Sequence, residues 1–258
     1  MPTFLFDNVV FGPVKSRRLG VSLGINLLPI DRKFCNFDCI YCECGLNETG
    51  KGAGHLPTKS DVHDALATKL KVMQQKGEAP DVITFAGNGE PTMHPAFAEI
   101  VEDTINLRNQ FFPAAAISVL SNSTMLHKAK VLEALKKVDQ NIMKLDSGLI
   151  STIKKLNSPT GNYDVEKIIA QLKSFNGNLI VQTMFTHGTV NGDYIDNTTD
   201  EDIDSLQRAF QIIRPQTLMI YTIDRDTPFQ GLQKVPKEEL NRIAQRFESL
   251  GIKVQVSA

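Results

Sequence analysis

The sequence predicts an α/β protein built around parallel strands. Six short apolar runs, most of them rich in Ile, Val, Leu or Thr, alternate with segments whose apolar residues recur at helical spacing. No linker, low-complexity stretch or internal repeat interrupts this alternation. We therefore expect one domain over residues 1–258. Six such units form either a doubly wound sheet or an incomplete (β/α)6 barrel, and periodicity alone does not distinguish these folds.

The expected strands are short, as strands buried on both faces of a parallel sheet are. They cover residues 22–28, 82–86, 116–120, 141–145, 179–185 and 217–223. In either fold, the residues that follow these strands meet at one edge of the sheet, where active sites of parallel α/β proteins lie. The polar residues at the strand ends are therefore the candidates for function.

The expected helices fill the intervals between the strands. They cover residues 61–76, 95–109, 127–138, 164–175, 200–213 and 236–250. The first is marked by Ser60 as a candidate cap and by Gly77 as a stop. The last has Pro236 in its first turn and Gly251 after its end. The acidic run that opens 200–213 is typical of a helix's first turn, so we assign it no function.

Composition excludes several classes of protein. The 258 residues carry 28 Lys and Arg against 29 Asp and Glu, and 41% of them are hydrophobic. These values exclude disordered, collagen-like and coiled-coil chains. The near-neutral charge also argues against a protein that binds mainly to the phosphate backbone of a nucleic acid. The start lacks a signal-peptide pattern, and no apolar stretch approaches the ~18 residues of a transmembrane helix. We expect a cytoplasmic protein without membrane contact.

All four cysteines of the chain fall within ten residues, in a loop over residues 30–45 after the first expected strand: Cys35, Cys39, Cys42 and Cys44. A mononuclear zinc site normally uses two separated pairs of ligands, and this sequence has no second pair. Three thiolates at this spacing suit a [4Fe–4S] cluster in which one iron stays open to another ligand. A structural zinc site or a chance cluster is the alternative.

The spacing Cys-x3-Cys-x-aromatic-Cys resembles the signature of the radical S-adenosylmethionine (SAM) enzymes, with Tyr41 as the aromatic residue. The resemblance implies that Cys35, Cys39 and Cys42 hold the cluster, that SAM chelates the open iron, and that Tyr41 lies beside adenine. It also implies the incomplete (β/α)6 TIM-like barrel. Cys44 is either a fourth ligand, which would block SAM, or a bystander, and the family pattern favours the bystander.

The loop after the second expected strand supports the same family. It reads Gly87-Asn88-Gly89-Glu90-Pro91. Two glycines permit a tight turn and close approach of a ligand to the backbone. Taken alone, such a turn is more often structural. It resembles, however, the Gly-Glu-Pro loop that receives the methionine amino group of SAM in the radical SAM enzymes, and it occurs at the expected place.

The ends of the later strands carry further polar residues. By position, the resemblance implies that Asp146, Ser147 and Gln182 hold the ribose and carboxylate of SAM, and that Ser121 and Asn122 contact SAM or the substrate. The alternative is that these short side chains only cap the following helices. Lys144 and Asp146 alternate within an extended segment, so both are expected to face the barrel interior.

An N-terminal extension over residues 1–20 contains a basic segment with Lys15, Arg17 and Arg18. Together with residues 24–29, it resembles a small radical SAM subgroup related to the wyosine tRNA-base enzymes. The three cations bind a phosphate or anionic substrate, or they form a solvated basic turn. Arg225 pairs with a carboxylate of SAM or substrate, or it lies on the surface beside its acidic neighbours.

The resemblance implies an enzyme in which a reduced cluster cleaves SAM to methionine and a 5′-deoxyadenosyl radical, which abstracts hydrogen from a substrate. An electron donor such as flavodoxin or ferredoxin is implied. The sequence does not identify the substrate, and near-neutral charge favours a small molecule, nucleoside or peptide over tRNA. Only Cys44 is left over, so we expect no second cluster. The alternative is a non-catalytic iron–sulfur or zinc protein, against which the Glu90–Pro91 loop argues.

Overall fold

The computed structural model describes residues 4–16, 18–47 and 54–258. Its strands are β1 (Val10–Ser16), β2 (Gly20–Ile25), β3 (Val82–Phe85), β4 (Ala116–Ser121), β5 (Gln140–Lys144), β6 (Ile180–Val190), β7 (Asp193–Asp196), β8 (Thr217–Thr222), β9 (Leu232–Lys234) and β10 (Lys253–Ser257). Its helices are α1 (Lys59–Lys76), the 3-10 helix η1 (Pro91–Met93), α2 (Phe97–Phe111), α3 (Ala129–Lys137), α4 (Ile150–Leu156), α5 (Val165–Lys173), α6 (Asp200–Ile213) and α7 (Lys237–Glu248).

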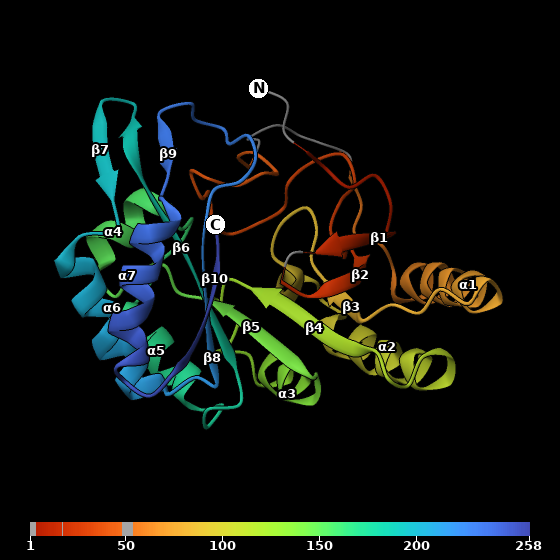
Figure 1. The fold of residues 1–258 in the computed structure, drawn as a ribbon. Coiled ribbons are helices and arrows are strands. Elements are labelled where there is room, and N and C mark those ends of the chain that lie inside the picture. The colour runs from red at the N-terminus through yellow and green to blue at the C-terminus, as the bar shows by residue number, and fades with distance from the viewer. Residues whose placement is uncertain (1–3, 17, 48–53) are drawn as a thin grey trace.

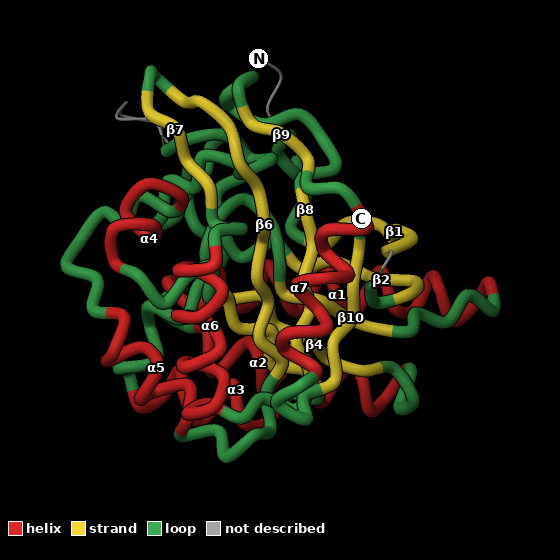
Figure 2. The backbone as a smooth tube through the Cα atoms, turned by 60° about the vertical axis from the view of Figure 1, so that its left-hand side comes forward, coloured by secondary structure: helices red, strands yellow, loops and turns green. Residues whose placement is uncertain are grey.

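The central sheet is largely parallel and curved. Strands β2, β3, β4, β5, β6, β8 and β10 follow one another in that order, each parallel to the next. β1 pairs antiparallel with β2 at one edge, and β10 forms the other. Helices α1–α3 lie beside the β2–β5 half of the sheet, and α4–α7 lie beside the other half (Figures 1 and 2). The expected incomplete barrel is confirmed.

The main hydrophobic core lies between the strands and these helices. Strands supply fully buried side chains such as Leu23 and Phe85, and α1 supplies Leu66 and Leu70. Burial of each such side chain contributes about 1.5–3 kcal/mol to the free energy of unfolding. The parallel strands are apolar because both of their faces are covered.

The ends of α1 show how local chemistry sets the helix boundaries. Thr58, and not Ser60, caps the helix: its hydroxyl accepts a hydrogen bond from the Asp61 amide, and the Asp61 carboxylate accepts one from the Thr58 amide. Gly77 ends the helix in the left-handed conformation at φ 71°, as expected.

All six expected strands and all six expected helices are present; α6 has the expected bounds, and the boundaries of the others are shifted. The first strand ends at Ile25 because the Asn26 side chain turns the chain back, accepting a hydrogen bond from the Leu28 amide at 3.2 Å. Four strands and two helices had no clear sequence pattern: β1, β7, β9, β10, α4 and the short 3-10 helix η1. The edge strands β1 and β10 are mostly half-buried or exposed, so they lack a long apolar run.

The fifth expected strand continues well beyond residue 185. The second half of β6 pairs antiparallel with β7 and β9. The buried side chains Val190, Ile195 and Leu232 of this three-stranded extension belong to a second apolar cluster, which also contains Phe37 and Ile40 of the cysteine loop. The extension therefore supports the loop on a small core of its own. Within the described ranges, no helix is both long and apolar enough to span a membrane.

Candidate active site

The cysteine loop is attached to the sheet on two sides. The Phe34 amide donates to the carbonyl of Asn88 at 2.8 Å, and the Glu90 amide donates to the carbonyl of Phe34 at 3.2 Å. On the other side, the Ile40 amide donates to the carbonyl of Leu156 at 2.9 Å. The loop is thus held between the turn after β3 and the end of α4.

The close approach of the two loops requires glycine at position 89. Its φ is 145°, and a Cβ at this position would lie 1.9 Å from the carbonyl oxygen of Phe34. No side chain larger than hydrogen fits there without moving one of the loops. The glycine-rich turn and the cysteine loop are therefore built as one unit.

A cavity of about 290 Å³ opens beside this unit, and all four cysteines line it. Seven other residues expected at the site also line it: Tyr41, Gly87, Gly89, Glu90, Ser121, Asn122 and Gln182. They come from the loops after β2 and β3, from the end of β4 and from the first half of β6. The structure thus brings together residues up to 147 positions apart, from Cys35 to Gln182, at the edge where function was expected.

The thiols receive hydrogen bonds suited to thiolate ligands. The side-chain amide of Asn157 donates to Cys39 Sγ at 3.3 Å, and the Phe37 backbone amide donates to Cys35 Sγ at 3.4 Å. Such donors to sulfur tune iron–sulfur clusters. Three soft thiolates in one cavity therefore fit a [4Fe–4S] cluster. Among the described residues, no three His, Cys, Asp or Glu side chains are arranged to hold a single metal ion.

The three ligand thiols have different proton affinities. Burial raises the pKa of Cys35 well above its usual range and raises that of Cys39 to about 11. Interaction with the Cys44 thiol lowers the pKa of Cys42 to about 6; burial opposes this shift, and the Lys33 ammonium assists it. Cys42 is therefore the thiol that is ionised at neutral pH before any metal is bound.

Lys33 is a buried cation that sequence reasoning did not identify. Its ammonium donates to the carbonyl of Gly45 at 3.0 Å and to the Asp38 carboxylate at 3.2 Å. Burial lowers the pKa of Lys33, but the nearby cysteines, Cys42 foremost, together raise this pKa by more than burial lowers it. The net shift of the Lys33 pKa is therefore upward. Its charge compensates negative charge on the thiolates. No spacing signal marks a lone lysine of this kind.

Glu90 is buried and held by four donors. One carboxylate oxygen accepts hydrogen bonds from the Ser121 hydroxyl at 2.9 Å and from the amide and hydroxyl of Thr92. The other oxygen accepts a hydrogen bond from the backbone amide of Asn122 at 2.6 Å. Burial raises the pKa of this carboxyl, and the four donors act in the opposite direction. The donors fix the orientation of the carboxylate at the cavity wall.

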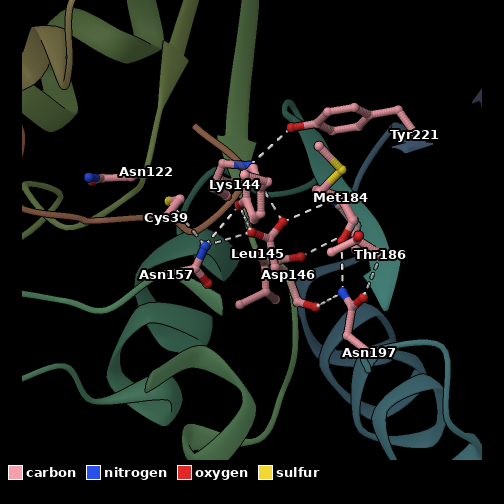
Figure 3. Close-up of polar contacts among 12 residues, drawn as sticks. Cys39, Asn122, Lys144, Leu145, Asp146, Asn157, Met184, Thr186, Asn197 and Tyr221 are labelled. Carbon is pink, nitrogen blue, oxygen red and sulfur yellow. Dashed lines mark hydrogen bonds and ion pairs between the residues drawn. The ribbon is translucent and has the colours of Figure 1, made fainter. Parts of the chain in front are cut away.

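Asp146 is the centre of a buried polar network (Figure 3). One carboxylate oxygen accepts from the Met184 amide at 2.9 Å and lies 3.5 Å from the Lys144 ammonium. The other accepts from Asn157 at 2.7 Å and from the Tyr41 hydroxyl. The Lys144 and Asp146 side chains thus lie on the same side of the extended segment, as expected. Asp146 itself is fully buried and does not line the cavity.

Four expected ligand residues are placed away from the cavity: Asn88, Pro91, Asp146 and Ser147. The Asn88 side chain binds the backbone of Phe6 and Pro29. The Ser147 hydroxyl donates to the Asp202 carboxylate at 2.5 Å and accepts from the Leu149 amide. The Asn88 and Ser147 side chains are already hydrogen-bonded to protein partners, so Ser147 supports the turn before α4 and is not available for SAM; it does not cap α4, which has no side-chain cap.

The basic residues of the N-terminal segment have different surroundings. Arg17 lies outside the described residues, and Lys15 is exposed on β1. Arg18 lines the cavity, with its guanidinium carbon 4.5 Å from the centre of the Tyr221 ring. Arg225 forms an exposed ion pair with Glu43 of the cysteine loop at 2.8 Å.

Other site residues came to light only in the structure. Tyr221 of β8 lines the cavity and its hydroxyl lies 3.1 Å from Lys144 Nζ. Asn197 is buried and donates to the backbone carbonyls of Asp146 and Met184, at 3.0 and 2.7 Å. Asn157 closes α4, a helix with no clear sequence pattern. Tyr221 alone had a signal, its place near the end of an expected strand.

Known proteins with similar sequences or folds were compared with this chain. It is 28% identical over 246 residues to a UPF0026 protein of Helicobacter pylori (strain J99), covering 94% of this chain and 74% of that one. Its fold resembles a radical SAM methyltransferase from Sphaerobacter thermophilus, with a TM-score of 0.66, 14% identity and coverage of 92% and 65%. It also resembles archaeal TYW1, with a TM-score of 0.54, 12% identity and coverage of 88% and 71%.

A family model described as the radical SAM superfamily matches residues 32–208, which include the cysteine loop and the Gly87–Pro91 turn. This superfamily uses a [4Fe–4S] cluster and SAM, and the positions of Cys35, Cys39 and Cys42 are consistent with cluster ligands. Its members need a reductant and a substrate. The geometry of the site and the family match agree, and the chain belongs to the radical SAM superfamily of enzymes.

Proposed function

We propose that this chain cleaves SAM reductively at the cavity beside its cysteine loop and uses the resulting 5′-deoxyadenosyl radical to remove hydrogen from a substrate. The observation that carries the proposal is structural: three thiols and the Glu90 carboxylate, from separate loops, line the same cavity. A protein that only carries a cluster has no need for the second loop. The substrate is a small molecule, a nucleoside or RNA base, or a peptide.

In this proposal Cys35, Cys39 and Cys42 hold the [4Fe–4S] cluster, and Cys44 is a bystander. When bound, the cluster supplies the electron that breaks the sulfonium bond of SAM. The chain's own contribution is to position SAM and exclude water. Cys39 and Tyr41 are buried, and their supporting network through Asn157 and Asp146 leaves both side chains little freedom to move.

Glu90 receives the amino group of SAM. Its carboxylate is oriented in advance by the donors from Ser121, Thr92 and Asn122, so little rearrangement accompanies binding. Ser121 and Asn122 act by holding Glu90, and the Gln182 side chain contacts SAM from β6. Asp146 acts through Tyr41: its carboxylate accepts a hydrogen bond from the Tyr41 hydroxyl and holds the Tyr41 ring at the cavity wall.

The resemblance of the upstream segment to wyosine-related enzymes supports a small, single-cluster subgroup. Chemistry that requires a second cluster is disfavoured, because Cys44 is the one cysteine left over. The near-neutral charge of the chain favours a small molecule or nucleoside over tRNA. A flavodoxin or ferredoxin supplies the electron.

SAM cleavage by the anaerobically reconstituted protein tests the proposal. After reduction with dithionite, the wild type is expected to produce 5′-deoxyadenosine and methionine. Cys39→Ala is expected to lose iron–sulfur absorbance and product, whereas Cys44→Ala keeps the absorbance. Loss of the cluster in Cys44→Ala as well would indicate a four-thiolate centre and contradict the proposal. A fully loaded wild type that does not bind SAM would indicate a non-catalytic iron–sulfur protein.

A further inference from the structure

Arg18 reaches across the open side of the sheet. It lies in the turn between β1 and β2, yet its guanidinium stacks on Tyr221 of β8, at 4.5 Å from the guanidinium carbon to the ring centre. In the sheet order, β3, β4, β5 and β6 separate β2 from β8. The contact therefore brings a cation from one end of the sheet to the cavity wall formed by the other.

The Arg18 guanidinium has an unsatisfied donor at the cavity. Its Nη1 is buried and has no hydrogen-bond partner, and among the described residues Arg18 forms no ion pair. A buried donor without a partner is costly, and the half-buried guanidinium also has no carboxylate beside it, in the described part of the chain, to compensate its charge. An anion in the cavity would accept from the donor and compensate the charge.

Lys144, the neighbouring cation, is already compensated. Its ammonium lies 3.5 Å from the Asp146 carboxylate and 3.1 Å from the Tyr221 hydroxyl. Arg18 and Lys144 thus flank the same tyrosine, but only Lys144 has a carboxylate partner. Of these two cations, Arg18 is therefore the one whose positive charge is not compensated by a carboxylate within the described ranges.

SAM does not supply this anion in the proposed binding mode. Its carboxylate and amino groups share one carbon atom, so the carboxylate stays close to the amino group that Glu90 receives. Glu90 follows β3, whereas the ring under Arg18 belongs to β8. The cavity is therefore lined by Glu90 on the β3 side and by Arg18, against Tyr221, on the β8 side.

We propose that Arg18 binds an anionic group of the substrate, a carboxylate or a phosphate. A guanidinium presents two parallel N–H donors that match the oxygens of either group, and the Tyr221 ring holds its plane in a fixed orientation. The inference rests on the proposed function and adds the substrate's chemical class to it: the substrate carries a negative charge at the end held against β8.

Binding of simple anions to the cluster-loaded, SAM-saturated protein tests this assignment. Inorganic phosphate and acetate are titrated separately by anaerobic calorimetry into wild type, Arg18→Gln, Arg18→Lys and the exposed control Arg208→Gln. We expect at least one anion to bind wild type saturably and at least tenfold more weakly to Arg18→Gln, with Arg18→Lys intermediate because it keeps charge without the paired donors. Arg208→Gln should match wild type. The anion that binds distinguishes a phosphate from a carboxylate.

Two results of the anion titrations would overturn the assignment: no saturable binding of either anion to wild type, or equal affinity in wild type and Arg18→Gln. Binding of SAM and of decarboxylated SAM is measured in parallel. If Arg18→Gln weakens binding of SAM but not of its decarboxylated form, Arg18 holds the SAM carboxylate and the assignment is wrong. Iron content and circular dichroism confirm that each variant is loaded and folded. SAM cleavage by wild type reports on the proposed function separately.

Discussion

The side-chain amide nitrogen of Asn157 lies 3.3 Å from the Sγ of Cys39. The same nitrogen donates to the Asp146 carboxylate at 2.7 Å and lies 2.8 Å from the Tyr41 hydroxyl. The last turn of α4 thereby connects a cluster ligand to the buried carboxylate beneath the site. We expect this contact to tune the electronic properties of the cluster through a residue outside both sequence motifs.

Replacing Asn157 with leucine should lower the reduction potential of the cluster. Amide donors to sulfur stabilise the more negative, reduced state, so their loss favours the oxidised state. We expect a decrease of tens of millivolts, given that ~59 mV corresponds to a tenfold change for one electron. Redox titration followed by electron paramagnetic resonance measures it. Asn197→Leu is the control. Asn197 is also buried, and its side-chain amide donates a hydrogen bond to the backbone carbonyl of Asp146. Equal decreases in both variants would contradict the role of the Cys39 contact.

Asp146→Asn should destabilise the fold more than it disturbs SAM contacts. The buried carboxylate accepts from three donors and compensates Lys144, so an amide would leave that ammonium without a counter-charge. Breaking a buried ion pair in this way costs about 3–5 kcal/mol. Urea unfolding under anaerobic conditions measures the loss. Removing Lys144 as well, in Lys144→Met/Asp146→Asn, should recover part of it. A stable Asp146→Asn protein with weakened SAM binding would assign Asp146 to the ligand instead.

Gly89→Ala should separate the cysteine loop from the turn after β3. The added Cβ would overlap the Phe34 carbonyl oxygen, and the positive φ adds strain. We expect loss of cluster binding and destabilisation of more than about 1 kcal/mol. Gly161→Ala is the matched control, because nothing lies within 4 Å of a Cβ there. Iron content and thermal unfolding of both variants decide the outcome, and normal cluster loading in Gly89→Ala would refute the steric account.

Alkylation of the metal-free protein should select Cys42 at neutral pH. The lowered pKa of about 6 makes Cys42 a thiolate at pH 7, whereas Cys39, with a pKa of about 11, stays protonated. The reaction rate should rise with pH through about 6 and then level off, since the thiolate is the nucleophile. Cys44→Ala removes the interaction that lowers the pKa and should move this midpoint upward. Mass spectrometry after iodoacetamide treatment identifies the site, and an unchanged midpoint would contradict the role of Cys44.

Glu90→Gln should weaken SAM binding while the cluster remains. Both carboxylate oxygens of Glu90 accept hydrogen bonds, so the NH₂ group of the glutamine would point at a donor of the protein. The substitution also removes the negative charge that meets the SAM amino group. The expected loss is about 1–3 kcal/mol of binding free energy. Equilibrium binding of SAM to the loaded protein measures it. Thr92→Val, which removes one donor to Glu90, should have a smaller effect.

The sequence by itself determined the order of strands and helices and the position of the two cofactor loops. Apolar periodicity is a local property, so it located six of the seven parallel strands and six of the helices. The cysteine spacing and the Gly87–Pro91 turn are also local, because a compact cofactor needs several ligands from one short segment. The cavity is lined by most of the residues expected at the site: Cys35, Cys39, Cys42, Tyr41, Gly87, Gly89, Glu90, Ser121, Asn122 and Gln182. Their roles toward the cofactor stay predictions.

Tertiary structure decided which polar side chains remain available at that cavity. Asn88 and Ser147 follow strands as expected, but partners distant in sequence, such as Phe6 and Asp202, occupy their polar groups. Buried polar groups take whichever partner the fold brings near, and no local pattern records that partner. For the same reason Arg18 and Tyr221, 203 positions apart in the sequence, meet only because the sheet curves and brings the β1–β2 turn to β8.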